Sequence, residues 1–317
     1  MKILVTGGAG FIGSHVVDAY IADGHDVVVI DNLSTGRREN LNPNAKFYHV
    51  DICSREIEEI FQAERPEILN HHAAQINVRK SVADPVFDCK VNILGFLNLM
   101  EAARKYSLKK VIFASSGGAI YGEQKEFPAT ENHPVNPVSP YGVAKFACEK
   151  YLHYYHVHHG VEYMVFRYAN IYGPRQNSQG ETGVVAVFFD RMIGGEQPVI
   201  NGDGEQTRDF VYVGDVVELN ECAIGIFQSE PKGIHHLFNV GTGVETKIVS
   251  LFNRVSEIVG KDLREVYDLD KIGENLRSSM VSNTVQKCLG YYPETQLRNG
   301  LKATFDYLMK TQKDIQR

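Results

Sequence analysis

The chain has 317 residues, of which 43% are hydrophobic and 23% charged, and its formal net charge is −6. This composition is typical of a globular enzyme, and the lack of a dense Lys/Arg run argues against a nucleic-acid partner. No apolar run approaches the roughly 20 residues that span a bilayer, so we expect no membrane partner. Met1 and Lys2 lead directly into an apolar strand, which indicates no signal peptide and a cytoplasmic protein. The five cysteines are scattered without metal-ligand spacing, so we expect reduced thiols and no metal.

A glycine-rich turn follows the first predicted strand. Residues 2–6 form a short apolar run typical of a buried parallel strand, residues 14–23 have a helical pattern, and between them lies Gly7-Gly8-Ala9-Gly10-Phe11-Ile12-Gly13. In this context Gly7 permits a tight turn, Gly10 lets the backbone approach a pyrophosphate, and Gly13 lets the helix pack on the strand. We therefore predict a dinucleotide site at the helix N-terminus. Its contacts are Gly7, Gly10, Phe11, Ile12 and Gly13.

A carboxylate ends the second predicted strand. Residues 27–30 are apolar and lead to Asp31, about twenty residues beyond the glycine turn, where a carboxylate can accept both hydroxyls of the adenosine ribose. A carboxylate there also repels a 2′-phosphate, which favours NAD over NADP, although Arg37 and Arg38 would tolerate a phosphate. The turn-rich loop that follows is predicted to frame the adenosine through Asn32, Ser34, Thr35 and Gly36.

The third and fourth predicted strands also end in candidate cofactor contacts. Residues 46–50 lead to Asp51 and Ile52, which could flank the adenine ring, and Asp51 could equally be the N-cap of a helix near residues 54–63. The fourth strand begins near residue 67 and ends in small side chains that let a cofactor approach the backbone. Its predicted contacts are Ala73, Ala74 and Gln75.

Two polar features near the fourth strand have structural interpretations. His71 and His72 are adjacent in a strand, so they face opposite ways and are not expected to share a metal ion. Residues 85–106 have a long helical pattern in which Asn92 lies among apolar neighbours. A polar amide in that setting usually braces a loop, so we predict that Asn92 braces one near the cofactor.

The fifth predicted strand and the helix after it carry the catalytic candidates. Residues 110–114 lead to Ser115 and Ser116, and ligands of open parallel sheets bind beyond the carboxyl ends of the strands. Tyr141 and Lys145 are four residues apart at the start of a predicted helix over residues 140–159, so they share a face. We expect the ammonium of Lys145, together with a nicotinamide cation, to stabilise the phenolate and lower the pKa of Tyr141, which suits a general base. Lys145 could also hold the nicotinamide ribose hydroxyls.

The remaining pattern predicts an α/β fold with a doubly wound parallel Rossmann sheet and a smaller C-terminal α/β substrate-binding domain. A sixth strand covers residues 161–167 and leads to Tyr168, and residues 236–240 could complete the first sheet. Residues 1–170 plus about 211–243 would form the NAD-binding domain. Residues about 171–210 plus 244–317 would form the nucleotide-sugar-binding domain. Arg208 suits a phosphate of a nucleotide substrate, or alternatively a surface pair with Asp209.

Four motifs together resemble the extended short-chain dehydrogenase/reductase family: Gly7-x-x-Gly10-x-x-Gly13, Asp31 to Gly36, Tyr141-x-x-x-Lys145, and Arg167-Tyr168-Ala169-Asn170-Ile171-Tyr172-Gly173. Within it, nearly the whole chain is most similar to the UDP-glucose (UDP-galactose) 4-epimerases and related nucleotide-sugar epimerases. The resemblance implies a tightly held NAD cofactor and a UDP-sugar substrate. It implies an isomerase that inverts C4 of a UDP-hexose through a transient 4-keto sugar, and commonly a homodimer, here through residues 86–106 and 138–159.

The resemblance also implies roles for individual residues. Tyr141 takes the O4 proton and Ser116 hydrogen-bonds O4, with Ser115 as the fallback because Gly117-Gly118 interrupts the serine run found in many relatives. The implied cofactor contacts include Asn92, Tyr141, Lys145 and Tyr168. The implied substrate contacts are Ser115, Ser116, Tyr141, Asn170, Val184, Val199, Asn201, Arg208, Lys271 and Glu274.

Two further departures from the family pattern concern the substrate. Lys271 and Glu274 stand where the family often has arginine and aspartate, and lysine lacks the bidentate fork of arginine. Ser278 stands near a position that is bulky in some relatives, so we expect N-acetylated UDP-hexoses to be accepted as well. Alternatives from the same family are a UDP-glucuronate 4-epimerase or decarboxylase. An alternative from another class is a non-catalytic nucleotide-binding protein.

Overall fold

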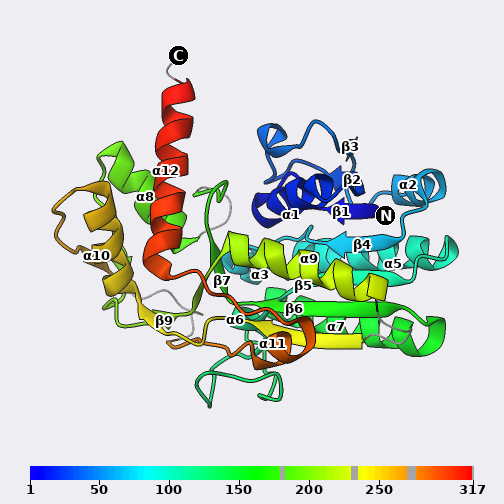
Figure 1. The fold of residues 1–317 in the computed structure, drawn as a ribbon. Coiled ribbons are helices and arrows are strands. Elements are labelled where there is room, and N and C mark those ends of the chain that lie inside the picture. The colour runs from blue at the N-terminus through cyan, green and yellow to red at the C-terminus, as the bar shows by residue number, and fades with distance from the viewer. Residues whose placement is uncertain (179–182, 230–234, 270–275, 316–317) are drawn as a thin grey trace.

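Seven parallel strands form the central sheet, in the order β11-β6-β5-β4-β1-β2-β3 (Figure 1). The computed structural model describes residues 1–178, 183–229, 235–269 and 276–315. The strands are β1 (Lys2–Thr6), β2 (Asp26–Asp31), β3 (Lys46–His49), β4 (Ile68–His71), β5 (Lys110–Ser116), β6 (Glu162–Tyr168) and β11 (His235–Val240). Except in β3, whose side chains are exposed or half-buried, most of their apolar residues are buried because helices cover both faces of the sheet. The predicted doubly wound sheet, completed by the strand near residues 236–240, is confirmed.

Helices pack against both faces of the sheet. On one face α1 (Phe11–Ala22) and α9 (Val213–Ser229) share an apolar cluster with β1, β2 and β6. On the other face a second cluster joins the sheet to α2 (Glu56–Glu64), α5 (Gly95–Lys105) and α7 (Pro140–His159). The chain reverses its winding direction between β1 and β4, and ligands of such sheets bind at that point.

The predicted helix over residues 85–106 is present but contains an irregular turn. It consists of α4 (Pro85–Cys89), a π-helical segment (Lys90–Leu94) and α5. Such segments inside α-helices often occur at functional sites. Two short helices, α3 (Val78–Ala83) and α6 (Gly117–Ile120), were not predicted, because neither is long enough to show an apolar period.

A second group of elements lies beside the carboxyl ends of the strands. Figure 1 shows α8 (Val184–Gly194), α10 (Ile248–Val259) and α12 (Leu297–Ile315) gathered there, apart from the sheet. Their apolar faces form a third cluster with β7 and β10. The short strands pair as β7 (Asn170–Tyr172) with β10 (Phe210–Tyr212), β8 (Ile200–Asn201) with β13 (Tyr267–Asp268), and β9 (Thr207–Arg208) with β12 (Thr246–Lys247).

One C-terminal helix packs with the sheet instead of this second group. Helix α11 (Asn283–Leu289) contacts β11 and α9, and its Val285 belongs to the apolar cluster on that face. The C-terminal segment therefore contributes to both parts of the molecule. Within the described ranges, every helix is too short or too polar to cross a bilayer.

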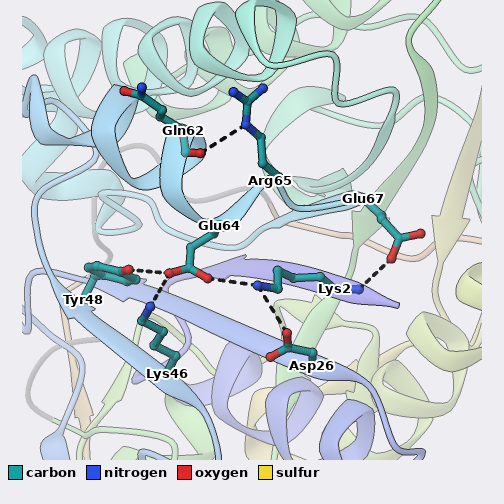
Figure 2. A network of polar contacts seen from close by, with 8 residues as sticks. All are labelled: Lys2, Asp26, Lys46, Tyr48, Gln62, Glu64, Arg65 and Glu67. Carbon is teal, nitrogen blue, oxygen red and sulfur yellow. Dashed lines mark hydrogen bonds and ion pairs between the residues drawn. The ribbon is translucent and has the colours of Figure 1, made fainter.

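A buried carboxylate joins the strands at the amino end of the sheet. Figure 2 shows Glu64, at the end of α2, between Lys2 of β1 and both Lys46 and Tyr48 of β3. Its side chain is only 4% exposed, and its nearest contact with Lys2 Nζ is 3.1 Å. Lys2 also lies 3.3 Å from Asp26 of β2. This network ties three strands and a helix together at the edge opposite the predicted site.

Candidate active site

A cavity of about 1120 Å³ runs along the carboxyl ends of β1, β4, β5 and β6 and continues to β8 and β9. Most of the residues predicted to bind cofactor or substrate line it. They are Gly7, Gly10, Phe11, Ile12, Gly13, Asp31, Asn32, Ser34, Thr35, Asp51, Ile52, Ala73, Ala74, Ser115, Ser116, Tyr141, Lys145, Tyr168, Asn170, Val184, Val199, Asn201 and Arg208. The fold therefore brings segments from residue 7 to residue 208 to one continuous cavity.

Five predicted residues do not line the cavity or are not described. Gly36 lies behind Asp31, because a Cβ at Gly36 would stand 2.9 Å from Asp31 Oδ1. Gln75 and Asn92 lie behind the cavity wall. Lys271 and Glu274 fall outside the described residues.

The glycine turn has the close approaches that a dinucleotide site requires. Gly7 has a φ of +71°, and a Cβ there would lie 2.7 Å from the backbone N of Ala73. A Cβ at Gly13 would lie 2.3 Å from the carbonyl oxygen of Gly7, so only glycine lets α1 approach β1 this closely. Gly10 is the N-cap of α1, and its side-chain-free backbone faces the cavity. These features fit a pyrophosphate held at the N-terminus of α1.

Asp31 at the end of β2 is held in place by two backbone N–H groups. Ala9 N donates to its Oδ2 at 3.0 Å and Leu33 N donates to its Oδ1 at 2.8 Å. Burial raises the pKa of Asp31, whereas these two hydrogen bonds lower it. The neighbouring arginines have other contacts, since Arg37 lies 3.9 Å from Glu39 and Arg38 lies over the ring of Phe47. The geometry therefore supports a ribose diol rather than a 2′-phosphate at Asp31.

Asp51 lines the adenosine end of the cavity, and the alternative role as a helix N-cap is wrong. Helix α2 begins at Glu56 with Arg55 as its N-cap. The carboxylate of Asp51 instead accepts hydrogen bonds from Cys53 N and from Asn32 Nδ2, both at 2.8 Å. It therefore closes a turn before α2 and holds the loop after β2 against the end of β3.

Asn92 fixes the loop that follows β4. Its Oδ1 accepts from Gln75 N at 2.8 Å, and its Nδ2 donates to Gln75 O at 2.9 Å, so one side chain pairs with both backbone groups of Gln75. This is the bracing that the apolar setting of Asn92 predicts. Ala73 and Ala74, just before this anchor, form part of the cavity wall.

The two serines at the end of β5 have different surroundings. Ser115 is buried and donates to Glu149 Oε1 at 2.6 Å, and Glu149 also accepts two hydrogen bonds from Arg167. Ser116 has no such buried partner among the described hydrogen bonds, and its side chain interacts with that of Tyr141. The geometry therefore places the Ser116 hydroxyl beside the phenol. Gly117 after it is required because Met280 Sδ occupies the space of a Cβ.

Tyr141 and Lys145 occupy the first two turns of α7, which Ser139 caps by accepting from Gly142 N. Lys145 Nζ donates to Ala114 O at 2.8 Å and lies 5.9 Å from the centre of the Tyr141 ring. Burial lowers the pKa of Lys145 to about 8. Burial raises the pKa of Tyr141, although the hydrogen bond with Ser116 partly offsets the rise. In the protein alone, desolvation of the phenol therefore dominates, and the lowering of the Tyr141 pKa by Lys145 together with a nicotinamide cation stays a prediction.

The far end of the cavity is lined by Asn170, Val184, Val199, Asn201 and Arg208 from β7, α8, β8 and β9. The alternative of a surface Arg208–Asp209 pair is wrong, because Asp209 is fully buried. Asp209 accepts hydrogen bonds from Thr242, Gly243 and Met280 instead. Ser278, which the sequence indicates as a small residue at the pocket, lines the cavity and is 3% exposed.

Several polar cavity residues were missed by sequence reasoning: Arg79, Gln176, Ser178, Arg191, Gln206 and Asp268. Most of them lie on short or irregular elements, Arg191 lies on α8, and no local motif marks any of them. His72 also lines the cavity, with its ring parallel to that of Tyr168. His71 turns the other way and bonds Thr6 Oγ1 at 2.6 Å. Across the described residues no group of three or more His, Cys, Asp and Glu side chains could hold a metal ion.

Known proteins share this arrangement over the whole chain. The model of the NAD dependent epimerase/dehydratase family matches residues 3–241, and the chain belongs to that family. The UDP-glucose 4-epimerase of Thermotoga maritima, solved with UDP-glucose, is 48% identical with a TM-score of 0.94, covering 98% of this chain and 100% of that one. The Thermus thermophilus UDP-glucose 4-epimerase, solved with NAD, is 40% identical with a TM-score of 0.91, covering 98% and 99%.

A third relative differs in its sugar. The UDP-N-acetylglucosamine 4-epimerase of Methanobrevibacter ruminantium, solved with UDP-N-acetylmuramic acid, is 34% identical. Its TM-score is 0.89, and the match covers 98% of each chain. The predicted family, fold class and NAD dependence are therefore confirmed.

Proposed function

We propose that this protein is an NAD-dependent epimerase that inverts C4 of a UDP-hexose, with UDP-glucose and UDP-galactose as its substrates. The observation that carries the proposal is the meeting of Tyr141, Lys145 and Ser116 with the glycine turn of α1 in one cavity. The cavity then continues to Arg208 and Asn201, which leaves room for a nucleotide beyond the reacting sugar. The similarity to UDP-glucose 4-epimerases supports this reading.

The side chains divide the chemistry between them. Tyr141 holds and returns the proton of the sugar O4, and Ser116, which interacts with Tyr141, hydrogen-bonds the same oxygen. Lys145 supplies a positive charge that favours the phenolate during turnover. NAD, held by the glycine turn, Asp31 and Lys145, would supply the hydride acceptor and donor that inversion of C4 through a transient 4-keto sugar requires. Asn170 and Arg208 bind the diphosphate, while Val184, Val199 and Asn201 line the uracil.

The substrate range includes N-acetylated sugars in this proposal. Ser278 contributes a small side chain to the cavity, where a bulky residue would reduce the space beside the sugar. We therefore expect UDP-GlcNAc and UDP-GalNAc to interconvert as well. Parallel assays with both sugar pairs test this, and a complete lack of turnover of the acetylated pair would refute it.

Incubation with a panel of UDP-sugars tests the activity. Purified protein is mixed with UDP-glucose, UDP-galactose, their N-acetylated counterparts and UDP-glucuronate without added NAD, and the products are identified by NMR. We expect an equilibrium mixture of C4 epimers, supported by resident cofactor. Protein that holds NAD and converts none of these sugars would refute the proposal and favour a non-catalytic nucleotide-binding role.

The Tyr141→Phe variant tests the assigned base. It removes the proton-transferring hydroxyl and leaves the ring in place, so we expect retained cofactor and a turnover lower by about 10²-fold or more. Tyr307→Phe is the matched control, because Tyr307 lies on α12 and does not line the cavity. Turnover in Tyr141→Phe comparable to that of the control would contradict the assignment.

The subunit organisation follows the same proposal. Residues 1–170 plus about 211–243 carry the cofactor, and residues about 171–210 plus 244–317 carry the nucleotide sugar, with α11 packed on the sheet.

A homodimer forms through α4, α5 and α7. This is supported by exposed apolar side chains on α4, on the π-helical segment that follows it and on α7: Val86, Phe87, Leu94, Tyr151, Tyr154 and Val157.

A further inference from the structure

Asp88 is a buried carboxylate directly behind the cavity wall. It lies on α4, is 1% exposed, and its Oδ1 accepts from Gln75 Nε2 at 2.9 Å and from Asn92 Nδ2 at 3.0 Å. Its Oδ2 is buried and has no hydrogen-bond partner among the described residues. A buried carboxylate oxygen without a partner is costly, so its retention requires a physical explanation.

The first part of that explanation is the orientation of two amides. A carboxylate only accepts hydrogen bonds, so the NH₂ groups of Gln75 and Asn92 must both face Asp88. Asn92 Oδ1 is then turned toward Gln75 N, and Gln75 Oε1 is turned toward Asn77 N, which donates at 2.7 Å. Asp88 thereby sets the direction of the Gln75 and Asn92 side-chain contacts that hold residues 75–77 beside the cavity.

The second part concerns the charges that face Lys145. On its own helix these groups are Tyr141, Cys148 and Glu149. Glu149 already forms a bidentate pair with Arg167, at 2.6 and 3.0 Å. Burial raises the pKa of Cys148 to about 12, so its thiol is neutral.

The elements packed against α7 contribute the remaining groups, which are His71 at the end of β4, His72 just after it and Asp88 from α4. Burial lowers the pKa of both histidines, that of His72 to about 3, so they are uncharged near neutral pH. Among the described groups that face Lys145, Asp88 is therefore the carboxylate without a cationic hydrogen-bond partner. Its neighbours Gln75 and Asn92 are neutral amides, which leave its charge uncompensated.

We propose that Asp88 is a positioning residue of this active site: it orients Gln75 and Asn92 to hold the cofactor-facing loop, and its negative charge keeps Lys145 an ammonium. The proposal deepens the function given above and rests on it. The two effects are separable, because the first depends on hydrogen bonds and the second on charge.

The negative charge of Asp88 favours the protonated form of Lys145, and this sets the direction of the expected pH shift. Burial lowers the pKa of Lys145 to about 8, and the nearby anionic groups, Asp88 included, counteract this. Removal of the Asp88 charge would lower the pKa of Lys145 further. The ammonium, and with it the contact to the nicotinamide ribose, would then be lost at a lower pH than in the wild type.

The Asp88→Asn variant isolates the charge, because asparagine keeps Oδ1 as an acceptor and replaces only the unpartnered Oδ2. The affinity for NADH is measured by fluorescence from pH 6 to pH 10, beside the pH profile of turnover. We expect the alkaline loss of affinity and of turnover to move down by about 0.5–1 pH unit. Asp84→Asn is the matched control: Asp84 is the exposed N-cap of α4, asparagine caps equally well, and its profile should match the wild type.

The Asp88→Glu variant provides an independent test if the asparagine variant does not fold. It keeps the charge and displaces the carboxylate, so NADH affinity should fall about tenfold while the alkaline limb stays in place. Superimposable pH profiles of folded Asp88→Asn and wild type would overturn the proposal, as would a shifted limb in Asp88→Glu. A wild type that binds NADH and epimerises no UDP-hexose would refute the proposed function, whereas epimerisation with unshifted profiles would refute only the role of Asp88.

Discussion

Two adjacent serines at the end of β5 have different surroundings and different roles. Ser115 donates to Glu149 inside the protein, whereas Ser116, the last residue of β5, interacts with Tyr141 at the cavity. The hydroxyl of Ser115 satisfies a buried ion pair between Glu149 and Arg167. The hydroxyl of Ser116 is the one available to a sugar oxygen. Ser115 is therefore a structural serine, and Ser116 is the serine that we propose to be catalytic.

Substitution of each serine separates these roles. We expect Ser116→Ala to lower kcat by about 10-fold to 100-fold with little change in the melting temperature, because it removes a hydrogen bond to O4. We expect Ser115→Ala to lower the free energy of unfolding by about 1–3 kcal/mol, because Glu149 loses a buried donor. Turnover and thermal melting of both variants check this. A larger kcat loss in folded Ser115→Ala than in Ser116→Ala would reverse the assignment.

At the scale of elements, the cofactor site depends on how closely α1 lies on β1. We expect Gly13→Ala to weaken NAD binding at least tenfold and to destabilise the fold by about 1–3 kcal/mol, since its Cβ would meet the Gly7 carbonyl at 2.3 Å. Gly225→Ala is the matched control, because Gly225 lies in α9 with no atom within 4 Å of an added Cβ. That change should stabilise the helix by about 1 kcal/mol. Cofactor titration and thermal melting measure both, and normal NAD affinity in Gly13→Ala would contradict the predicted site.

At the amino ends of the strands, the polar network around Glu64 makes the stability of the fold depend on pH. Although burial raises the pKa of Glu64, hydrogen bonds from Lys46, Tyr48 and Lys2 lower it to about 2, against an ordinary value of 4.5. A lowered pKa means that the stabilisation is complete above about pH 5 and is lost as the pH falls toward 2. We expect Glu64→Gln to cost on the order of 2 kcal/mol at pH 7 and progressively less at lower pH.

Urea denaturation from pH 7 to pH 3 measures this difference. Glu58→Gln serves as the control, because the Glu58–Lys105 pair is exposed and exposed pairs contribute little. If the loss of unfolding free energy in Glu64→Gln does not become smaller as the pH falls, then packing, and not charge, accounts for the role of Glu64.

At the scale of the whole molecule, the adjacent helices α4 and α7 present exposed apolar side chains. Val86 and Val157 are 78% and 60% exposed, which is typical of an interface in an otherwise charged surface. We expect a dimer in sedimentation equilibrium, and a shift to monomer in Val86→Glu/Val157→Glu because two buried charges would be unpaired. Val244→Glu, on a separate exposed valine, should leave the dimer intact. A monomeric wild type would contradict the proposed assembly.

Short-range pattern in the sequence determined the sheet, the glycine turn and the Tyr141–Lys145 face. Strands and helices show side-chain periods of two and 3.6 residues, and glycine permits turns that other residues do not. Both properties depend only on residues that are close together in the sequence. The chain order of apolar strands and helices was enough to predict the doubly wound fold. The identity of Asp31 at a strand end was enough to favour NAD.

Only the tertiary structure decided which side chains meet and how their charges behave. The π-helical turn that faces Asn92 toward Gln75, and the burial that raises the pKa of Tyr141, arise from packing between segments far apart in the chain. The separation of Ser115 from Ser116 depends on Glu149, which lies 34 residues beyond Ser115. Asp88 had no sequence signal, because its significance comes from two neighbouring amides and from Lys145 across a helix interface. Desolvation and long-range contacts are properties of the packed molecule, so local sequence could not reveal them.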